Sequence, residues 1–253
     1  MKLVTWNVNG IRSAVNKGFL DYLETEAPDI CCVQEVKAQE VNLPDNVLNP
    51  SGYYGIWYPS ERPGYSGVAV FTKIKPENIQ LGMGNAKYDV EGRVIQLDYP
   101  DFTLFNVYFP NGQKDEDRLQ YKLDFYQDFF DYCEDLRKSG KNIIITGDYN
   151  IAHKEIDLAN PKENENYSGF LPVERAWLDN LIDLKYIDVF RNFNSEPDQY
   201  TWWTYRFGAR KRNIGWRIDY FFVNQEFLSR VKDCKIRSDI LGSDHCPVEM
   251  YIE

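Results

Sequence analysis

The hydrophobic residues of the chain gather in short runs that are separated by polar or glycine-containing turns, a pattern typical of β-strands. Two of these runs, 92–99 and 102–111, are separated only by a tight Pro100-Asp101 turn. The runs that predict strands are 2–8, 29–36, 66–73, 92–99, 102–111, 141–150, 217–224 and 247–252.

Helical spacing of apolar residues appears in three segments. Residues 13–26 show it before Pro28, residues 119–136 show it before the natural stop at Gly140, and residues 173–184 form the third segment. The predicted strands outnumber these helices and their order along the chain is mixed. The pattern therefore favours an α/β or α+β sandwich over a doubly wound parallel sheet.

Composition restricts the cellular context. The 253 residues are 43% hydrophobic and contain no low-complexity tract, fixed-period repeat or Pro/Gly/Ser-rich linker, so we expect one domain over residues 1–253. No apolar run reaches 18 residues and no basic-then-apolar leader opens the chain, so we expect no membrane span, signal peptide or membrane partner. The five cysteines are scattered without a C-x-x-C pair, which fits a reducing, intracellular location and argues against a zinc site.

The formal net charge of −10 argues against a polyanionic partner, because whole-protein charge sets the long-range field. A local basic patch can override that field. The segment 206–212, "RFGARKR", is the clearest candidate, although such a segment is more often a solvated loop.

Polar side chains recur at the ends of the apolar strands. A buried acid or amide costs a few kcal/mol if it lacks a partner, so each needs an explanation. Any single one is explained by a turn that its side chain caps. Taken together, they predict a polar rim, and they fall in residues 7–9, 34–35, 108–112, 148–150, 217–219 and 243–245.

The chemistry of this rim suits a hard divalent cation and a phosphate ester, since Mg²⁺ takes few carboxylates and keeps several waters. Of the two histidines, His245 follows Asp244 and has Asp219 a strand away, so a carboxylate could orient it to act on an oxyanion. His153 has no obvious partner in the sequence and is interpreted as structural.

An ordered series of segments carries a family resemblance. They run from residue 2 to about 252 without a missing block: "LVTWNVNGIR", "PDICCVQEVK", "GYSGVAVFTK", "EGRVIQLDY", "YFPNG", "ITGDYNIAHKEIDL", "GFLPVERAWLD", "YTWWTYR", "NIGWRIDYFFV" and "GSDHCPV". The chain resembles the exonuclease III/AP endonuclease family of DNA repair enzymes, which belongs to the DNase I-like phosphoesterases. The resemblance implies a four-layered α/β sandwich of two packed mixed β-sheets flanked by helices.

The resemblance also implies an activity. Enzymes of this family cut duplex DNA 5′ to an abasic site and leave a 3′-hydroxyl and a 5′-deoxyribose phosphate, using Mg²⁺ with Mn²⁺ as a substitute. It further implies 3′-to-5′ exonuclease and 3′-phosphodiesterase activity, and it leads us to expect a monomer associated with the nucleoid.

Matching the family's motifs residue by residue implies a role for each rim position. The metal positions are Asn7, Asn9, Glu35 and Asp244, with Glu35 as the direct ligand. Asn9 is Asp in some members of the family, so here the metal's charge rests more on Glu35 and Asp244. The positions at the phosphate and the attacking water are Tyr108, Asn111, Asp148, Asn150, Asp219 and His245. Asp148 is the best candidate for the base, with Tyr108 and His245 as the alternatives for acid and base roles.

Three tryptophans, Trp202, Trp203 and Trp216, match the family's pocket for the base-free sugar, although core aromatics are an equally good explanation of the residue types alone. The position of Trp202 is often Phe in the family, which would make this pocket tighter. The expected contacts to the DNA backbone are Arg93, Lys114, Arg206, Arg210, Lys211 and Arg212.

Two alternatives remain for the function. One is a less specific DNase I-like nuclease or another phosphoesterase, such as a lipid or inositol phosphatase, and the tryptophan pocket argues against it. The other is a non-catalytic damaged-DNA binding module. The intact set of acids and His245 argues against that, because a binding module has no use for it.

Overall fold

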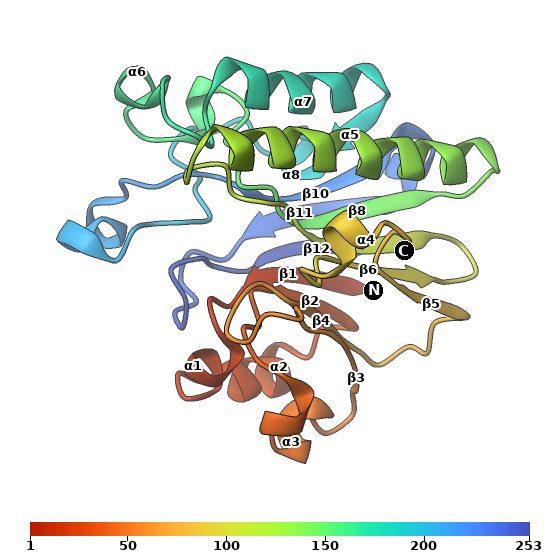
Figure 1. The fold of residues 1–253 in the computed structure, drawn as a ribbon. Helices are drawn as coiled ribbons and strands as arrows, with labels where there is room; N and C mark the ends of the chain where they lie inside the picture. Colours follow the sequence, from red (N-terminus) through yellow and green to blue (C-terminus); the bar gives the residue numbers. More distant parts are fainter.

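Two six-stranded β-sheets pack face to face in the computed structural model, which describes residues 1–253 (Figure 1). Helices cover the outer face of each sheet, so the order of layers is helix, sheet, sheet, helix. This confirms the predicted four-layered sandwich.

The first sheet has the strand order β11-β12-β1-β2-β4-β3. It is mixed, because β1 and β2 are parallel while its other neighbours are antiparallel. Its strands are β1 (Lys2–Asn7), β2 (Ile30–Gln34), β3 (Tyr54–Tyr58), β4 (Val68–Thr72), β11 (Val231–Ile236) and β12 (Val248–Ile252).

The second sheet has the order β5-β6-β7-β8-β10-β9 and is also mixed, with β7 and β8 as its parallel pair. Its strands are β5 (Asn78–Leu81), β6 (Val94–Asp98), β7 (Thr103–Tyr108), β8 (Ile143–Asp148), β9 (Tyr186–Asp188) and β10 (Asp219–Asn224).

All eight strands that the apolar runs predict are present. The four strands that the pattern missed, β3, β5, β9 and β11, are the four edges of the two sheets. An edge strand is partly exposed, so its sequence carries a weaker hydrophobic signal. In β5, for example, nearly all residues are exposed.

The long helices lie where the periodicity predicts them. Helix α5 (Glu116–Lys138) begins after Asp115, whose side chain accepts a hydrogen bond from the backbone N–H of Arg118 at 2.8 Å. Helix α7 (Pro172–Asp183) lies beside α5 over the second sheet (Figure 1). None of the helices combines the length and the apolar character that a bilayer crossing needs.

The predicted helix 13–26 is instead two helices, α1 (Ile11–Val15) and α2 (Phe19–Glu26), because Gly18 between them has a left-handed φ of 96°. These two cover the first sheet together with α3 (Asp45–Leu48). The remaining short helices are α4 (Ala86–Asp89), α6 (Pro161–Asn164) and α8 (Val189–Phe193), with 3₁₀ turns at Glu40–Asn42, Glu155–Asp157, Arg206–Gly208, Arg210–Arg212 and Gln225–Arg230.

The core has three parts that follow the layers. Side chains such as Leu104 and Val248 fill the space between the sheets, Phe105 and Phe129 pack where α5 meets the second sheet, and Phe19 packs under the first sheet. Burying each such side chain stabilises the fold by about 1.5–3 kcal/mol. The sheets are therefore held rigidly against each other, and the chain segments at one end of them form the functional rim.

Candidate active site

Asp148, the last residue of β8, pairs with a functional side chain on each side of its strand. In the parallel pair with β7 it lies opposite Tyr108, and in the antiparallel pair with β10 it lies opposite Asp219. The strand register therefore brings two acids and a phenol together, although they are far apart in the sequence. Two carboxylates directly opposite each other repel, so the site needs a positive partner.

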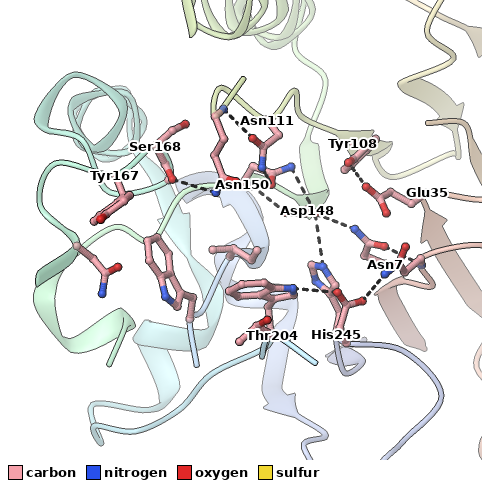
Figure 2. A pocket seen from close by; sticks show the side chains of 18 of the residues that line it. Asn7, Glu35, Tyr108, Asn111, Asp148, Asn150, Tyr167, Ser168, Thr204 and His245 are labelled. Carbon is pink, nitrogen blue, oxygen red and sulfur yellow. Dashed lines mark hydrogen bonds and ion pairs between the residues drawn. The ribbon is translucent and has the colours of Figure 1, made fainter. Parts of the chain in front are cut away.

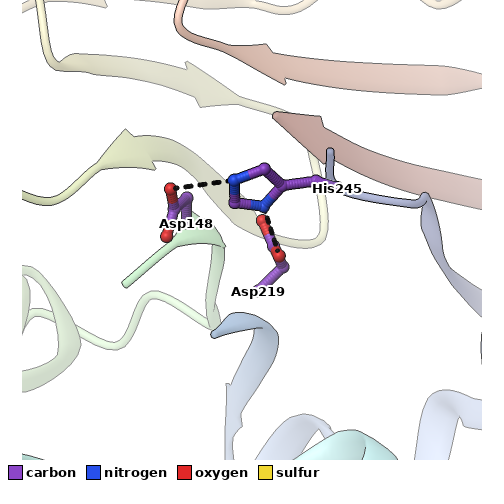
Figure 3. A group of neighbouring side chains, drawn as sticks. All are labelled: Asp148, Asp219 and His245. Carbon is purple, nitrogen blue, oxygen red and sulfur yellow. Dashed lines mark hydrogen bonds and ion pairs between the residues drawn. The ribbon is translucent and has the colours of Figure 1, made fainter. Parts of the chain in front are cut away.

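His245 supplies that positive charge. Its ring lies between the two acids (Figure 3). Its Nδ1 atom lies 2.8 Å from Oδ2 of Asp219, and its Nε2 atom lies 3.9 Å from Oδ2 of Asp148. Thr201 fixes the acid from behind, because its hydroxyl donates a hydrogen bond of 2.6 Å to Asp219 Oδ2. The imidazole is thus held by one acid and directed at the other.

The electrostatics of this group follow from burial and charge. Burial of the imidazole opposes protonation, but the carboxylates of Asp219 and Asp148 outweigh it and raise the pKa of His245 to about 10. Burial, together with the charge of Asp219, raises the pKa of Asp148 to about 7. At neutral pH the histidine is therefore an imidazolium, and Asp148 is poised between its proton-accepting and protonated forms.

Amide groups orient Asp148. The Nδ2 of Asn7 donates to its Oδ2 at 2.8 Å, and the backbone N–H of Asn150 donates to its Oδ1 at 2.8 Å. Asn150 has a left-handed φ of 52° and gives its own Nδ2 to the carbonyl of Phe109 at 2.9 Å. Asn111 completes the chain by donating to Oδ1 of Asn150 at 3.1 Å (Figure 2).

Tyr108 faces Glu35 across the two sheets, and its hydroxyl donates to Oε1 of that carboxylate. Burial and the neighbouring charge of Glu35 raise the pKa of Tyr108 well above its usual range. The tyrosine is therefore a neutral phenol, which can donate a hydrogen bond to a phosphate oxygen but cannot act as a phenolate.

Glu35 begins a line of polar contacts that leads to Asp244. Lys37 Nζ lies 2.8 Å from Oε2 of Glu35 and donates to Oδ1 of Asn9 at 2.6 Å. Asn9 in turn donates to Oδ1 of Asp244 at 2.9 Å. Burial opposes ionisation of Asp244, but the charge of His245 and the bonds from its neighbours lower its pKa.

The donor set of the rim fits a hard cation. Asp148, Asp219 and His245 form a compact group whose ligand atoms lie within 4.8 Å of one another, although the imidazolium of His245 has no free lone pair for a cation. Oδ1 of Asp219 is buried without a hydrogen-bond partner, so the cluster has an unsatisfied negative atom. Glu35 and Asp244, which are among the residues expected to hold the metal, are not members of that group. They line the pocket described next, together with Asp148 and His245.

The pocket beside these groups has a volume of about 560 Å³. Figure 2 shows side chains that line it. Trp202 and Trp216 line it, with ring centroids 6.4 Å apart at 86°. Trp202 also donates from its indole Nε1 to Oδ2 of Asp244 at 3.1 Å, which links the apolar wall to the polar line. Trp203, the third tryptophan expected in the pocket, does not line it. It is only 2% exposed and bonds Asn213 Oδ1 instead, so it is a core aromatic.

The basic segment divides into exposed and structural residues. Arg206, Lys211 and Arg212 are exposed, and so is Lys114. Arg210 is not free for DNA, because it donates to the carbonyls of Ser243, Ser238 and Ile240 and its guanidinium lies over the Trp203 ring at 4.6 Å. Arg210 therefore anchors the loop that presents its basic neighbours, and its expected role as a DNA contact is revised.

Arg93 also differs from expectation. Its side chain is 2% exposed, and it donates to Glu91 at 2.5 Å, to the carbonyl of Tyr108 at 2.8 Å and to the hydroxyl of Tyr65 at 3.1 Å. These contacts within the protein occupy the guanidinium donors, so Arg93 holds the backbone of Tyr108 in place and does not reach the surface. Its place at a strand end suggested exposure, but the strand that follows it, β6, has a neighbouring strand on both sides.

Several site residues were not assigned a role at the site from the sequence. Lys37 carried a signal, because it follows Glu35 by two residues. Thr201 carried none, since a lone hydroxyl residue resembles any turn. Ser243, whose hydroxyl donates to the carbonyl of Asn7 at 2.8 Å, lay in the predicted rim segment 243–245 but had no role of its own. His153 lies elsewhere, with Nε2 2.9 Å from Oδ1 of Asp179, and burial lowers its pKa.

Comparison with known proteins points in one direction. The model of the Endonuclease/Exonuclease/phosphatase family matches residues 4–245. An exodeoxyribonuclease of Bacillus subtilis is 42% identical over 254 residues, covering 100% of this chain and 99% of that protein. The DNA repair nuclease APEX1 of Danio rerio is 42% identical over 257 residues, covering 100% of this chain and 82% of that protein.

Solved structures of related nucleases share the fold of the whole chain. An AP endonuclease from Archaeoglobus fulgidus superposes with a TM-score of 0.90 at 28% identity, covering 100% of this chain and 99% of that one. A single-residue variant of the 3′ phosphatase NExo from Neisseria, bound to a product DNA hairpin, superposes with a TM-score of 0.92 at 29% identity, covering 100% of this chain and 99% of that one.

Proposed function

The chain belongs to the endonuclease/exonuclease/phosphatase family and is a DNA repair nuclease of its exodeoxyribonuclease and AP endonuclease branch, and we propose that its substrate is duplex DNA with an abasic site. It hydrolyses the phosphodiester bond 5′ to the lesion and acts as a monomer, as the resemblance to the family implies. The products are a 3′-hydroxyl and a 5′-deoxyribose phosphate.

One observation carries this proposal. The groups suited to a phosphate, Asp148, His245 and Tyr108, line the same pocket as Trp202 and Trp216. Bulky walls beside a hydrolytic centre hold a flipped sugar and exclude an intact base. A general phosphoesterase needs the first set but not the second, so the combination favours a lesion-specific nuclease.

The proposed mechanism begins at Asp148. Its raised pKa of about 7 suits a general base, and the bonds from Asn7 and Asn150 direct its carboxylate toward the attacking water. Deprotonation of that water and in-line attack on phosphorus form a new P–O bond as the P–O3′ bond breaks, and the released 3′ oxygen takes up a proton from solvent to give the 3′-hydroxyl.

Charge builds on the non-bridging phosphate oxygens during this attack. The imidazolium of His245, the hydroxyl of Tyr108 and the amide of Asn111 provide donors for those oxygens. Each such donor in a dry site is worth roughly 10²–10³ in rate. Asp219 keeps His245 charged and fixed in place.

The family is metal-dependent, and the carboxylates of Glu35, Asp148 and Asp244 line one pocket. We assign the ion as Mg²⁺, with Mn²⁺ as a substitute, and Glu35, Asn7, Asn9 and Asp244 as the residues that would hold it. Bound there, the ion would supply Lewis-acid stabilisation of the phosphate. The ammonium of Lys37 lies 2.8 Å from Oε2 of Glu35, so it would have to share that carboxylate with the ion.

The same groups serve a phosphate at a 3′ end, so we also propose 3′-to-5′ exonuclease and 3′-phosphodiesterase activity.

The test of the abasic-site activity compares end-labelled duplexes that carry an abasic site, a uracil or no lesion, each with Mg²⁺ or with EDTA. We expect a nick only at the abasic site and only with metal. The absence of such a nick would refute the proposed function.

A further inference from the structure

A fully buried ion pair lies behind the site, between α5 and α7. Lys122 Nζ is 2.6 Å from Oε1 of Glu174, and both side chains are 0% exposed. Burying two charges carries a large desolvation cost, and an apolar pair of the same volume is often at least as stable. The hydrogen bonds of the pair show which segments of the site it holds in place.

The lysine end holds the turn that presents the proposed base. Lys122 Nζ donates to the backbone carbonyl of Asn150 at 2.8 Å. The backbone N–H of that same residue donates to Asp148, and its side chain accepts from Asn111. The position of Asn150 therefore depends on a charge-assisted bond from α5.

The glutamate end holds the opposite wall of the pocket. Glu174 Oε2 accepts from the backbone N–H of Gly169 at 2.5 Å, and its Oε1 accepts from the hydroxyl of Ser168 at 2.8 Å. Gly169 has a left-handed φ of 100° and passes close to Trp216, since a Cβ there would lie 3.1 Å from the indole ring. Both Ser168 and Gly169 line the pocket.

We propose that Lys122 and Glu174 are a positioning pair that sets the spacing between the hydrolytic turn at Asn150 and the lesion-pocket wall at Gly169. Neither residue touches the substrate, and the inference rests on the proposed function for the identity of that substrate. Because the pair spans both segments, a shift in it misplaces the sugar relative to the attacking groups. A displacement of 1 Å at a reacting centre costs about 100-fold in rate.

Two double variants separate this role from a purely structural one. A single change would leave one buried charge unpaired, so both charges are removed together. K122M/E174Q keeps an acceptor for the Gly169 N–H but leaves the Asn150 carbonyl without its bond. K122M/E174L removes both contacts. The matched control is K2M/E249Q. It removes a partly buried ion pair, with Lys2 Nζ 2.9 Å from Oε1 of Glu249, at the end of β1 that is farthest from Asn7.

Kinetics are measured on the abasic duplex and on bis(p-nitrophenyl) phosphate, a small diester that needs no lesion pocket. We expect K122M/E174Q to lower kcat about 10-fold or more on both substrates. We expect K122M/E174L to raise KM in addition, and only for the abasic duplex. The control pair should lower Tm by a similar amount and leave kcat and KM unchanged.

Folded double variants with wild-type kcat and KM would overturn the inference and leave the pair a structural one. If the double variants do not fold, E174D decides, because it keeps both charges but shortens the carboxylate by one methylene. A folded E174D with wild-type kinetics overturns the inference, and a drop of about 10-fold in kcat/KM supports it. If the wild type nicks no abasic duplex, the proposed function fails and the pair is judged on the small diester alone.

Discussion

The Nδ1 atom of His245 lies 2.8 Å from Oδ2 of Asp219, and this contact sets the charge state of the whole site. It accounts for much of the rise in the pKa of His245 to about 10 against the opposing effect of burial. The imidazolium in turn offsets the repulsion between Asp219 and Asp148. This contact and its neighbours can be tested through activity, stability, metal dependence and DNA affinity.

The first prediction concerns the pH profile of kcat/KM on the abasic duplex. Activity should rise as Asp148 ionises near pH 7 and should fall as His245 loses its proton near pH 10. D219N removes the charge that favours the imidazolium, so the alkaline limb should move to lower pH by at least about one unit. An alkaline limb that stays in place would show that His245 does not carry it.

The second concerns stability without metal. The folded pKa of His245 is raised above its ordinary value of 6.5, so its stabilisation is complete below that value and is lost as pH rises toward 10. Asp148, with a pKa of about 7, loses the rest of its proton by about pH 8–9, so it adds only a small part of this slope and only at the neutral end. Urea denaturation in EDTA should show the free energy of unfolding falling by on the order of 2–4 kcal/mol between pH 7 and 10. H245Q should flatten this slope.

The third concerns the base. D148N keeps the shape of the side chain but cannot accept the water's proton, so kcat should fall by at least about 10³-fold. DNA affinity, measured by fluorescence anisotropy, should survive, since the exposed cations are untouched. D131N, on the exposed face of α5, is the control and should behave as the wild type. Full activity in D148N would remove Asp148 from the mechanism.

The fourth concerns the metal. E35Q removes the carboxylate expected to ligate the ion, so the Mg²⁺ concentration for half-maximal activity should rise by about 10-fold or more. Activity is followed in a Mg²⁺ titration, and direct binding is measured by calorimetry. E40Q, an exposed change on the following turn, should leave the titration unchanged. An unchanged titration in E35Q would place the ion at other ligands.

The fifth concerns the basic loop. Lys211, Arg206 and Arg212 are exposed, and each phosphate contact contributes about 0.9 to the slope of log affinity against log salt. The triple change R206A/K211A/R212A should therefore lower that slope by about 2–3. R210A should lower Tm instead, since its guanidinium bonds three backbone carbonyls of the neighbouring segment. A steep slope in the triple variant would place the DNA contacts elsewhere.

Local patterning was enough to predict the interior strands and the long helices, because burial of a strand or of one helix face leaves a period in the sequence. It also determined the residue types at the strand ends, since polar groups there stand out against apolar runs. The ordered motifs added roles to those positions, and Asp148, Asp219 and His245 lie together as expected.

Which of several residues of the same type can reach DNA or the pocket depends on how distant segments pack in the fold. Arg210 and Lys211 are neighbours in one basic run, yet the first bonds backbone carbonyls and the second is exposed. Trp202 and Trp203 are also neighbours, and one lines the pocket while the other is in the core. Residue type and spacing are local, whereas exposure depends on which distant segment packs against each side chain. For the same reason no local pattern indicated that Lys122 and Glu174, 52 residues apart, form a buried pair.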